Sequence, residues 1–75
     1  MESHNNEARV VLGEVKAELA RQNLSGRALA RMIDTSPIYV SRRLSGEVPI
    51  SVADLTRVAG VLQVPVTQFF ERSVA

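Results

Sequence analysis

The stretch LSGRALARMIDTSPIYVSRRLSGEVP, residues 24–49, contains two short segments in which apolar side chains recur every three or four residues. Such spacing puts the apolar side chains on one face of an α-helix. The pattern therefore predicts one helix over residues 26–33 and another over residues 37–45, joined by a tight turn at Asp34 and Thr35. The side chains expected to hold the two helices together are Leu29, Ile33, Val40 and Leu44.

Residues with strong positional preferences mark the ends of these two helices. Ser25 and Ser36 stand where a hydroxyl can accept a hydrogen bond from a free amide of the first turn. Pro37 suits a first helical position, because its missing N–H costs nothing there. Gly46 predicts the end of the second helix, and Asp34 is expected to take positive φ in the turn at some cost in strain.

Two helices joined in this way have the outline of a helix-turn-helix, in which the second helix lies in the major groove of DNA. Ala30 adds a geometric requirement to this outline. The two helices cross closely one turn before the bend, so the crossing requires a small side chain at this position. The pattern therefore favours residues 37–45 as the helix that contacts DNA.

Three further helices are expected around this pair, so the predicted fold is all-α, a compact five-helix bundle. A fourth helix over residues 52–62 begins at a Ser51 cap, and a short last helix covers residues 66–71. The first helix covers residues 7–22, and Asn23 can end it in the left-handed conformation. Its expected inward face consists of Ala8, Val11, Leu12, Val15 and Leu19.

The same periodicity assigns other side chains to the core or to solvent. Met32 is expected in the core, and one of Phe69 and Phe70 is expected to be buried while the other stays partly exposed. The solvent-facing side of the first helix is expected to carry Glu14, Lys16 and Glu18.

A length of 75 residues allows a single domain. Its predicted limits are residues 7–72, with a disordered N-terminal tail at residues 1–6 and a C-terminal tail at residues 73–75. The chain has no cysteine and one histidine, His4, in a polar stretch, so neither a metal site nor a cofactor is expected. No carboxylate pair or nucleophile beside a histidine indicates catalysis, so the chain is not expected to be an enzyme.

Charge is concentrated in the middle of the chain. Residues 21–43 carry five arginines against one aspartate, a net charge of +4, although the whole chain has a net charge of only +1. Arginine is suited to bidentate contacts with phosphate and guanine. This distribution is compatible with an anionic polymer as partner, and equally with a solvated surface that favours arginine.

Residues 24–49, followed by LTRVAGVLQVPVTQFF at residues 55–70, resemble the Cro/repressor-type helix-turn-helix family of phage and bacterial regulators. The run SRRLSGEVP, residues 41–49, is similar to small regulators of actinobacteria and their phages. The resemblance spans about Val10 to Phe70 and implies the λ-repressor-like fold. The chain departs from the family pattern at three positions, where the family usually has Gln, Gly and an apolar residue and this chain has Gly26, Asp34 and Arg43.

The outward face of the second helix of the motif supplies the candidate contacts with DNA. Arg42 is the best candidate for a guanine, with a phosphate contact as the alternative, and Ile38 could touch a thymine methyl. The residues expected to read bases are Ser36, Pro37, Ile38, Ser41 and Arg42. The residues expected to contact the DNA backbone are Ser25, Gly26, Arg27, Tyr39, Arg43 and Ser45.

The resemblance implies a sequence-specific regulator of transcription, a repressor that acts by occupying an operator in double-stranded DNA. A weak homodimer, formed on DNA or before it, is expected, with no membrane or small-molecule partner and a cytoplasmic location. The alternative is a DNA-binding or interaction module of a larger regulator, or an antitoxin. In that case the apolar end at Phe69 and Phe70 would contact a partner.

Overall fold

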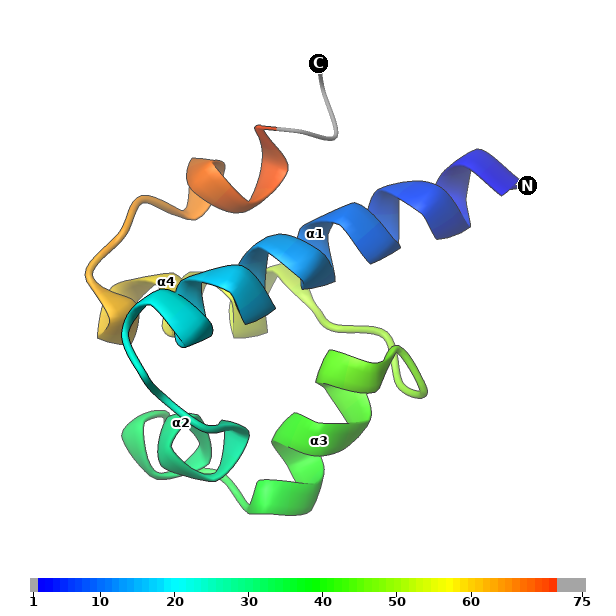
Figure 1. Cartoon of the computed structure of the whole chain (residues 1–75). Helices are drawn as coiled ribbons and strands as arrows, with labels where there is room; N and C mark the ends of the chain where they lie inside the picture. The colour runs from blue at the N-terminus through cyan, green and yellow to red at the C-terminus, as the bar shows by residue number, and fades with distance from the viewer. Residues whose placement is uncertain (1, 72–75) are drawn as a thin grey trace.

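The computed structural model describes the backbone of residues 2–71 and the side chains of residues 7–71. Over this range the chain forms α1 (Glu2–Arg21), α2 (Gly26–Met32), α3 (Pro37–Ser45), α4 (Val52–Leu62) and the 3₁₀ helix η1 (Val66–Phe70). In Figure 1, α1 crosses the middle of the molecule, with η1 on one side of it and α2 and α3 on the other. The described part is therefore all-α, as predicted, with four α-helices and a 3₁₀ helix rather than five α-helices.

The fifth predicted helix is a 3₁₀ helix because the segment is short and poorly capped. Pro65 occupies its N-cap position and makes no side-chain cap hydrogen bond. The 3₁₀ form is used mainly in short helical segments of this kind. The segment still places Phe69 in the core with none of its surface exposed, whereas Phe70 is half-buried, as predicted.

The first helix is longer than its apolar pattern indicates. It begins at Glu2, five residues before its predicted start at residue 7, while Met1 and residues 72–75 lie outside the described part. Polar residues carry no hydrophobic period, yet adding them to an existing helix needs no new nucleation.

The predicted bounds of α3 and α4 are confirmed, and α2 begins where predicted and ends one residue early, at Met32. Hydroxyl oxygens of Ser25, Ser36 and Ser51 each accept a hydrogen bond from the amide three residues later, at donor–acceptor distances of 3.0, 3.2 and 3.0 Å. Gly46 ends α3 in the left-handed conformation with φ of 85°. Asp34 carries the bend between α2 and α3 at φ of 60°.

The core lies where α1, α2, α3, α4 and η1 meet, and α2 and α3 are its most closely packed pair of helices. Ala30 has none of its surface exposed, and its carbonyl accepts a hydrogen bond of 2.8 Å from the amide of Thr35 across the turn. The close crossing of α2 and α3 is therefore confirmed. The buried hydrophobic side chains are Val11, Leu12, Val15, Leu19, Leu29, Ala30, Ile33, Val40, Leu55, Val58, Ala59, Leu62 and Phe69.

Two predictions about hydrophobic burial are wrong. Met32 is 43% exposed, because the inward face of α2 is occupied by Leu29, Ala30 and Ile33. At 100° per residue, Met32 stands roughly 100° around the helix axis from the centre of that face. Ala8 is exposed as well, so the buried stripe of α1 begins at Val11.

The prediction that Glu18 faces solvent is also wrong. Glu18 is only 7% exposed, and its carboxylate accepts hydrogen bonds from Arg21 (3.0 Å), Gln22 (2.8 Å) and Gln68 (2.8 Å). Gln68 belongs to η1, which packs on α1 and covers this side of the helix. Three donors replace the water that the carboxylate loses.

Candidate nucleic-acid interface

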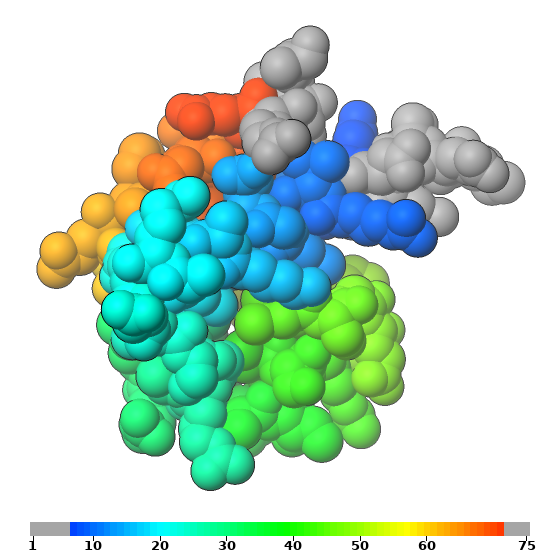
Figure 2. Space-filling model, in the orientation of Figure 1, coloured from blue at the N-terminus to red at the C-terminus, as the bar shows by residue number. Residues whose placement is uncertain are grey.

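The outer face of α3 is built from the predicted base-reading residues. The structure exposes all of Ser36, Pro37, Ile38, Ser41 and Arg42, while Val40 on the opposite side is 4% exposed and packs in the core. Ile38 is 60% exposed and lies on this face with no hydrophobic cover from the described residues. Figure 2 shows α2 and α3 side by side at one end of the molecule, away from η1.

Arg42 extends from the last turn of α3 into solvent. Its side chain is 53% exposed, and its Nε lies 3.8 Å from a carboxylate oxygen of Glu47, itself on the exposed loop after α3. An exposed ion pair of this kind contributes little to stability. The guanidinium is therefore free to exchange Glu47 for another acceptor without disturbing the core.

The start of α2 brings a second cation to the same end of the molecule. Arg27 is exposed, and within residues 7–71 neither it nor Arg31 forms an ion pair. Gly26 beside it has no side chain, and a Cβ there would stand 3.7 Å from Cγ1 of Val40 and 3.8 Å from Cδ1 of Leu44. The first turn of α2 thus packs directly onto α3, and an ordinary alanine would fit in the remaining space.

The hydroxyl of Ser45 is used to close the end of α3. It donates a hydrogen bond of 3.0 Å to the carbonyl of Arg42 and accepts one of 3.2 Å from the amide of Glu47. The side chain is exposed, so these bonds remain accessible to solvent.

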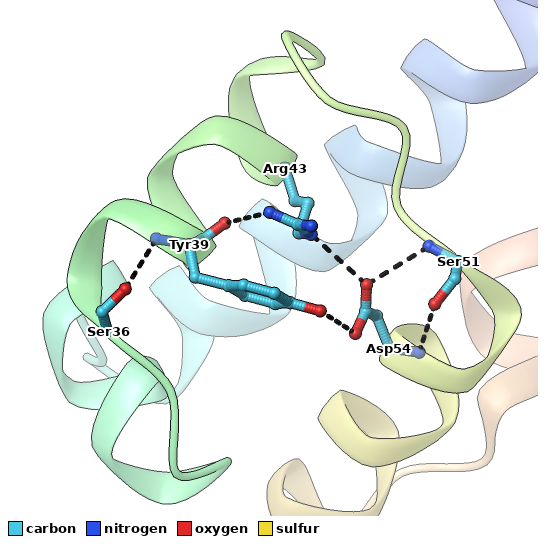
Figure 3. Close-up of polar contacts among 5 residues, drawn as sticks. All are labelled: Ser36, Tyr39, Arg43, Ser51 and Asp54. Carbon is cyan, nitrogen blue, oxygen red and sulfur yellow. Dashed lines mark hydrogen bonds and ion pairs between the residues drawn. The ribbon is translucent and has the colours of Figure 1, made fainter.

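Tyr39 and Arg43 are engaged within the protein (Figure 3). The hydroxyl of Tyr39 donates a hydrogen bond of 2.8 Å to Asp54 on α4, and Nε of Arg43 lies 3.5 Å from the other oxygen of that carboxylate. The guanidinium carbon of Arg43 stands 3.5 Å above the centre of the Tyr39 ring. Arg43 and Tyr39 were expected to contact the DNA backbone, whereas here the guanidinium and the hydroxyl both turn toward Asp54.

Asp54 is the functional candidate that the sequence pattern missed. It completes a capping box with Ser51, whose amide donates to its Oδ2 at 3.4 Å. Burial raises the pKa of the Asp54 carboxyl. Hydrogen bonds from Tyr39 and Ser51, together with the charge of Arg43, lower this pKa by more than burial raises it, so the net shift is downward. The four-residue spacing of Tyr39 and Arg43 was the available signal.

The five arginines of residues 21–43 therefore divide into two that contact a buried carboxylate and three that do not. Arg21 is paired with Glu18 at 2.8 Å, and Arg43 faces Asp54. On α2, Arg27 and Arg31 are exposed with no ion pair within residues 7–71, and on α3 Arg42 is exposed with only a 3.8 Å contact to Glu47. No helix in the described part combines the length and apolar character needed to cross a membrane.

An exposed α3 held at a fixed angle by a buried α2 crossing defines a helix-turn-helix domain, whose class binds DNA. Comparison with protein families agrees with this assignment. The helix-turn-helix family model matches residues 15–69, and the chain belongs to this Cro/C1-type helix-turn-helix family. Searches of curated proteins and of solved structures each found no match to the chain.

Proposed function

We propose that the chain is a sequence-specific regulator of transcription that represses by occupying an operator. The observation that carries the proposal is the exposed Ile38 on α3, placed among Ser36, Ser41 and Arg42. An isolated apolar side chain on a solvent-exposed helix face does not stabilise the fold, but it can pack against the methyl group of a thymine in the major groove. Hydroxyl and guanidinium groups beside it match the polar edges of neighbouring bases.

Each residue of the interface takes a role that follows from its exposure. Arg42 reads a guanine through O6 and N7, and Ile38 contacts a thymine methyl. Arg27, at the start of the helix that crosses the DNA backbone, neutralises a phosphate. Further base contacts come from Ser36, Pro37 and Ser41, and further backbone contacts from Ser25, Gly26 and Ser45.

Operator binding by two copies is part of the proposal. Helix-turn-helix dimers bind half-sites about one helical turn apart. A stable interface buries about 800 Å² on each partner, and the chain exposes 5001 Å² in total. We therefore propose a weak dimer that forms on DNA.

The test selects DNA sites for the purified chain from a random duplex library and then measures repression. The selected site should contain two half-sites about one turn apart, with a guanine and a thymine in each. Transcription in vitro from a promoter that overlaps this site should fall as the protein is added, while a scrambled site leaves transcription unchanged. Selection without enrichment would contradict sequence-specific binding, and increased transcription would contradict repression.

A further inference from the structure

The cluster formed by Tyr39, Arg43 and Asp54 joins the DNA-contacting helix to the rest of the domain. The backbone of α3 packs closely on α2 and less extensively on α1, and its close approaches to α4 are sparse. Side chains connect α3 to α4 instead, because Tyr39 and Arg43 of α3 each contact one oxygen of the Asp54 carboxylate. Besides the shared apolar core, the Asp54 carboxylate thus holds two polar side chains of α3 against α4.

The same cluster sequesters a positive charge. The side chain of Arg43 is 21% exposed and that of Asp54 is 10% exposed. The Nε atom of Arg43 is buried without a hydrogen bond, so the nearby carboxylate and the ring of Tyr39 compensate its charge. A second guanidinium nitrogen donates a hydrogen bond of 3.2 Å to the carbonyl of Tyr39, and this bond holds the guanidinium against α3.

Arg43 follows Arg42 directly in the chain, and Arg42 is exposed on the face proposed to enter the groove. The Arg43 guanidinium is turned away from that face, toward Asp54 and the ring of Tyr39. A phosphate contact carries no sequence information, so an additional one would strengthen binding to every DNA sequence.

We infer that Asp54 is a positioning residue that withholds Arg43 from the DNA backbone and so raises the preference of the domain for its operator. This inference rests on the proposed function, since it concerns how that function discriminates between sequences. Asp54→Asn keeps the shape of the side chain and one acceptor oxygen, which can serve the Ser51 amide while the new amide nitrogen donates to the Tyr39 hydroxyl, but it removes the negative charge. Arg43 is then free to turn toward a phosphate.

The experiment measures affinity for the selected operator and for a scrambled duplex over a series of salt concentrations. The proteins compared are the wild type, Asp54→Asn, Arg43→Met and the double variant. The slope of log K against log salt should steepen by about 0.9 in Asp54→Asn, the value for one added phosphate contact. Binding to the scrambled duplex should strengthen more than binding to the operator. Arg43→Met should leave the wild-type slope unchanged, and the double variant should return to it.

A matched control separates this effect from a general change of charge. Glu7→Gln makes the same change in net charge at an exposed residue of α1 that forms no ion pair within residues 7–71. Its salt slope should remain that of the wild type. Equal steepening in Glu7→Gln and Asp54→Asn would overturn the inference.

Two further outcomes would overturn it. An unchanged slope in a folded Asp54→Asn variant would leave Asp54 with a purely structural role. A slope reduced by about 0.9 in Arg43→Met would mean that Arg43 already contacts a phosphate, and this comparison decides the matter even if Asp54→Asn fails to fold. A wild type that selects no operator would instead defeat the proposed function, so the two failures are distinguishable.

Discussion

Arg42 and Arg27 carry the same charge but occupy different places, so their loss should have different effects. Arg42 lies on the exposed face of α3, whereas Arg27 lies in the first turn of α2. Arg42→Ala should cost about 1–3 kcal/mol on the operator and relax the preference at one base pair. Arg27→Ala should weaken all sequences alike and reduce the salt slope by about one.

These two variants are compared by binding to every single-base variant of the operator at two salt concentrations. A uniform loss of affinity in Arg42→Ala would make Arg42 a phosphate contact, and base reading would then fall to Ser36, Ile38 and Ser41. A loss of preference at one base in Arg27→Ala would place α2 in the groove instead of across the backbone.

Ala30 tests the α2–α3 crossing without touching DNA. It has no exposed surface, and Leu29 beside it is 1% exposed, so Ala30→Leu has no room for the added carbons. Overpacking of this kind costs roughly 1–3 kcal/mol of unfolding free energy. Denaturation by urea, followed by circular dichroism, should show a lower midpoint together with weaker operator binding. Wild-type values for both would show that the crossing tolerates a large side chain.

At the scale of helices, two glycines in mid-helix weaken their elements without a structural reason. Gly13 in α1 and Gly60 in α4 are exposed, and a Cβ at either position would meet no atom within 4 Å beyond the backbone of its own helix. Gly13→Ala and Gly60→Ala should each stabilise the fold by about 0.5–1 kcal/mol, because glycine loses more backbone entropy on folding than alanine.

Gly46→Ala is the matched control for these glycine variants. Gly46 ends α3 at φ of 85°, where an L side chain is strained, so alanine should lower the melting temperature. Calorimetry of the three single variants provides the comparison. Destabilisation by Gly13→Ala or Gly60→Ala would mean that these exposed faces are covered in the assembled protein.

Local signals explain why so much of the helical order was predictable. Ser25, Ser36 and Ser51 cap helices through bonds spanning three residues, and Gly46 needs only its own backbone conformation. Such interactions depend on only a few consecutive residues, so α3 and α4 begin and end where predicted. The exposed face of α3 follows from the same periodicity.

The errors concern side chains whose partners are distant in the chain. Glu18 is buried because Gln68, fifty residues later, covers it, and no periodicity within α1 encodes that contact. Asp54 and Tyr39 are fifteen residues apart and meet only when α3 packs beside α4. Met32 lies at the edge of a two-turn helix, where an apolar residue near the core face can still point to solvent.

At the scale of the whole molecule, two carboxylates link stability to pH. Hydrogen bonds from Gln22, Arg21 and Gln68 lower the pKa of Glu18, as the Tyr39 and Ser51 bonds and Arg43 do for Asp54 against the effect of burial. A carboxyl whose pKa is lower in the folded state binds a proton more readily when unfolded. Its stabilising contribution is present above the ordinary carboxyl pKa of about 4 and is lost as pH falls through the lowered value.

The melting temperature should therefore fall as the solution is acidified below about pH 4. Glu18→Gln should lower the melting temperature at neutral pH, and the difference from the wild type should shrink in acid, where the wild-type carboxylate is protonated. Melting curves of both proteins from pH 7 to pH 2 test this expectation. A difference that stays constant with pH would show that the Glu18 charge contributes nothing.

The contacts of Glu18 also determine which parts of the chain open together. Gln22 donates to Glu18 and, at 2.9 Å, to the carbonyl of Leu62, while Gln68 bonds Glu18 from η1. Lifting η1 alone would strip the carboxylate of a donor and expose Phe69 to water. Amides of η1 should therefore exchange with deuterium in the same slow, cooperative event as those in the second half of α1, instead of fraying first as a chain end normally does.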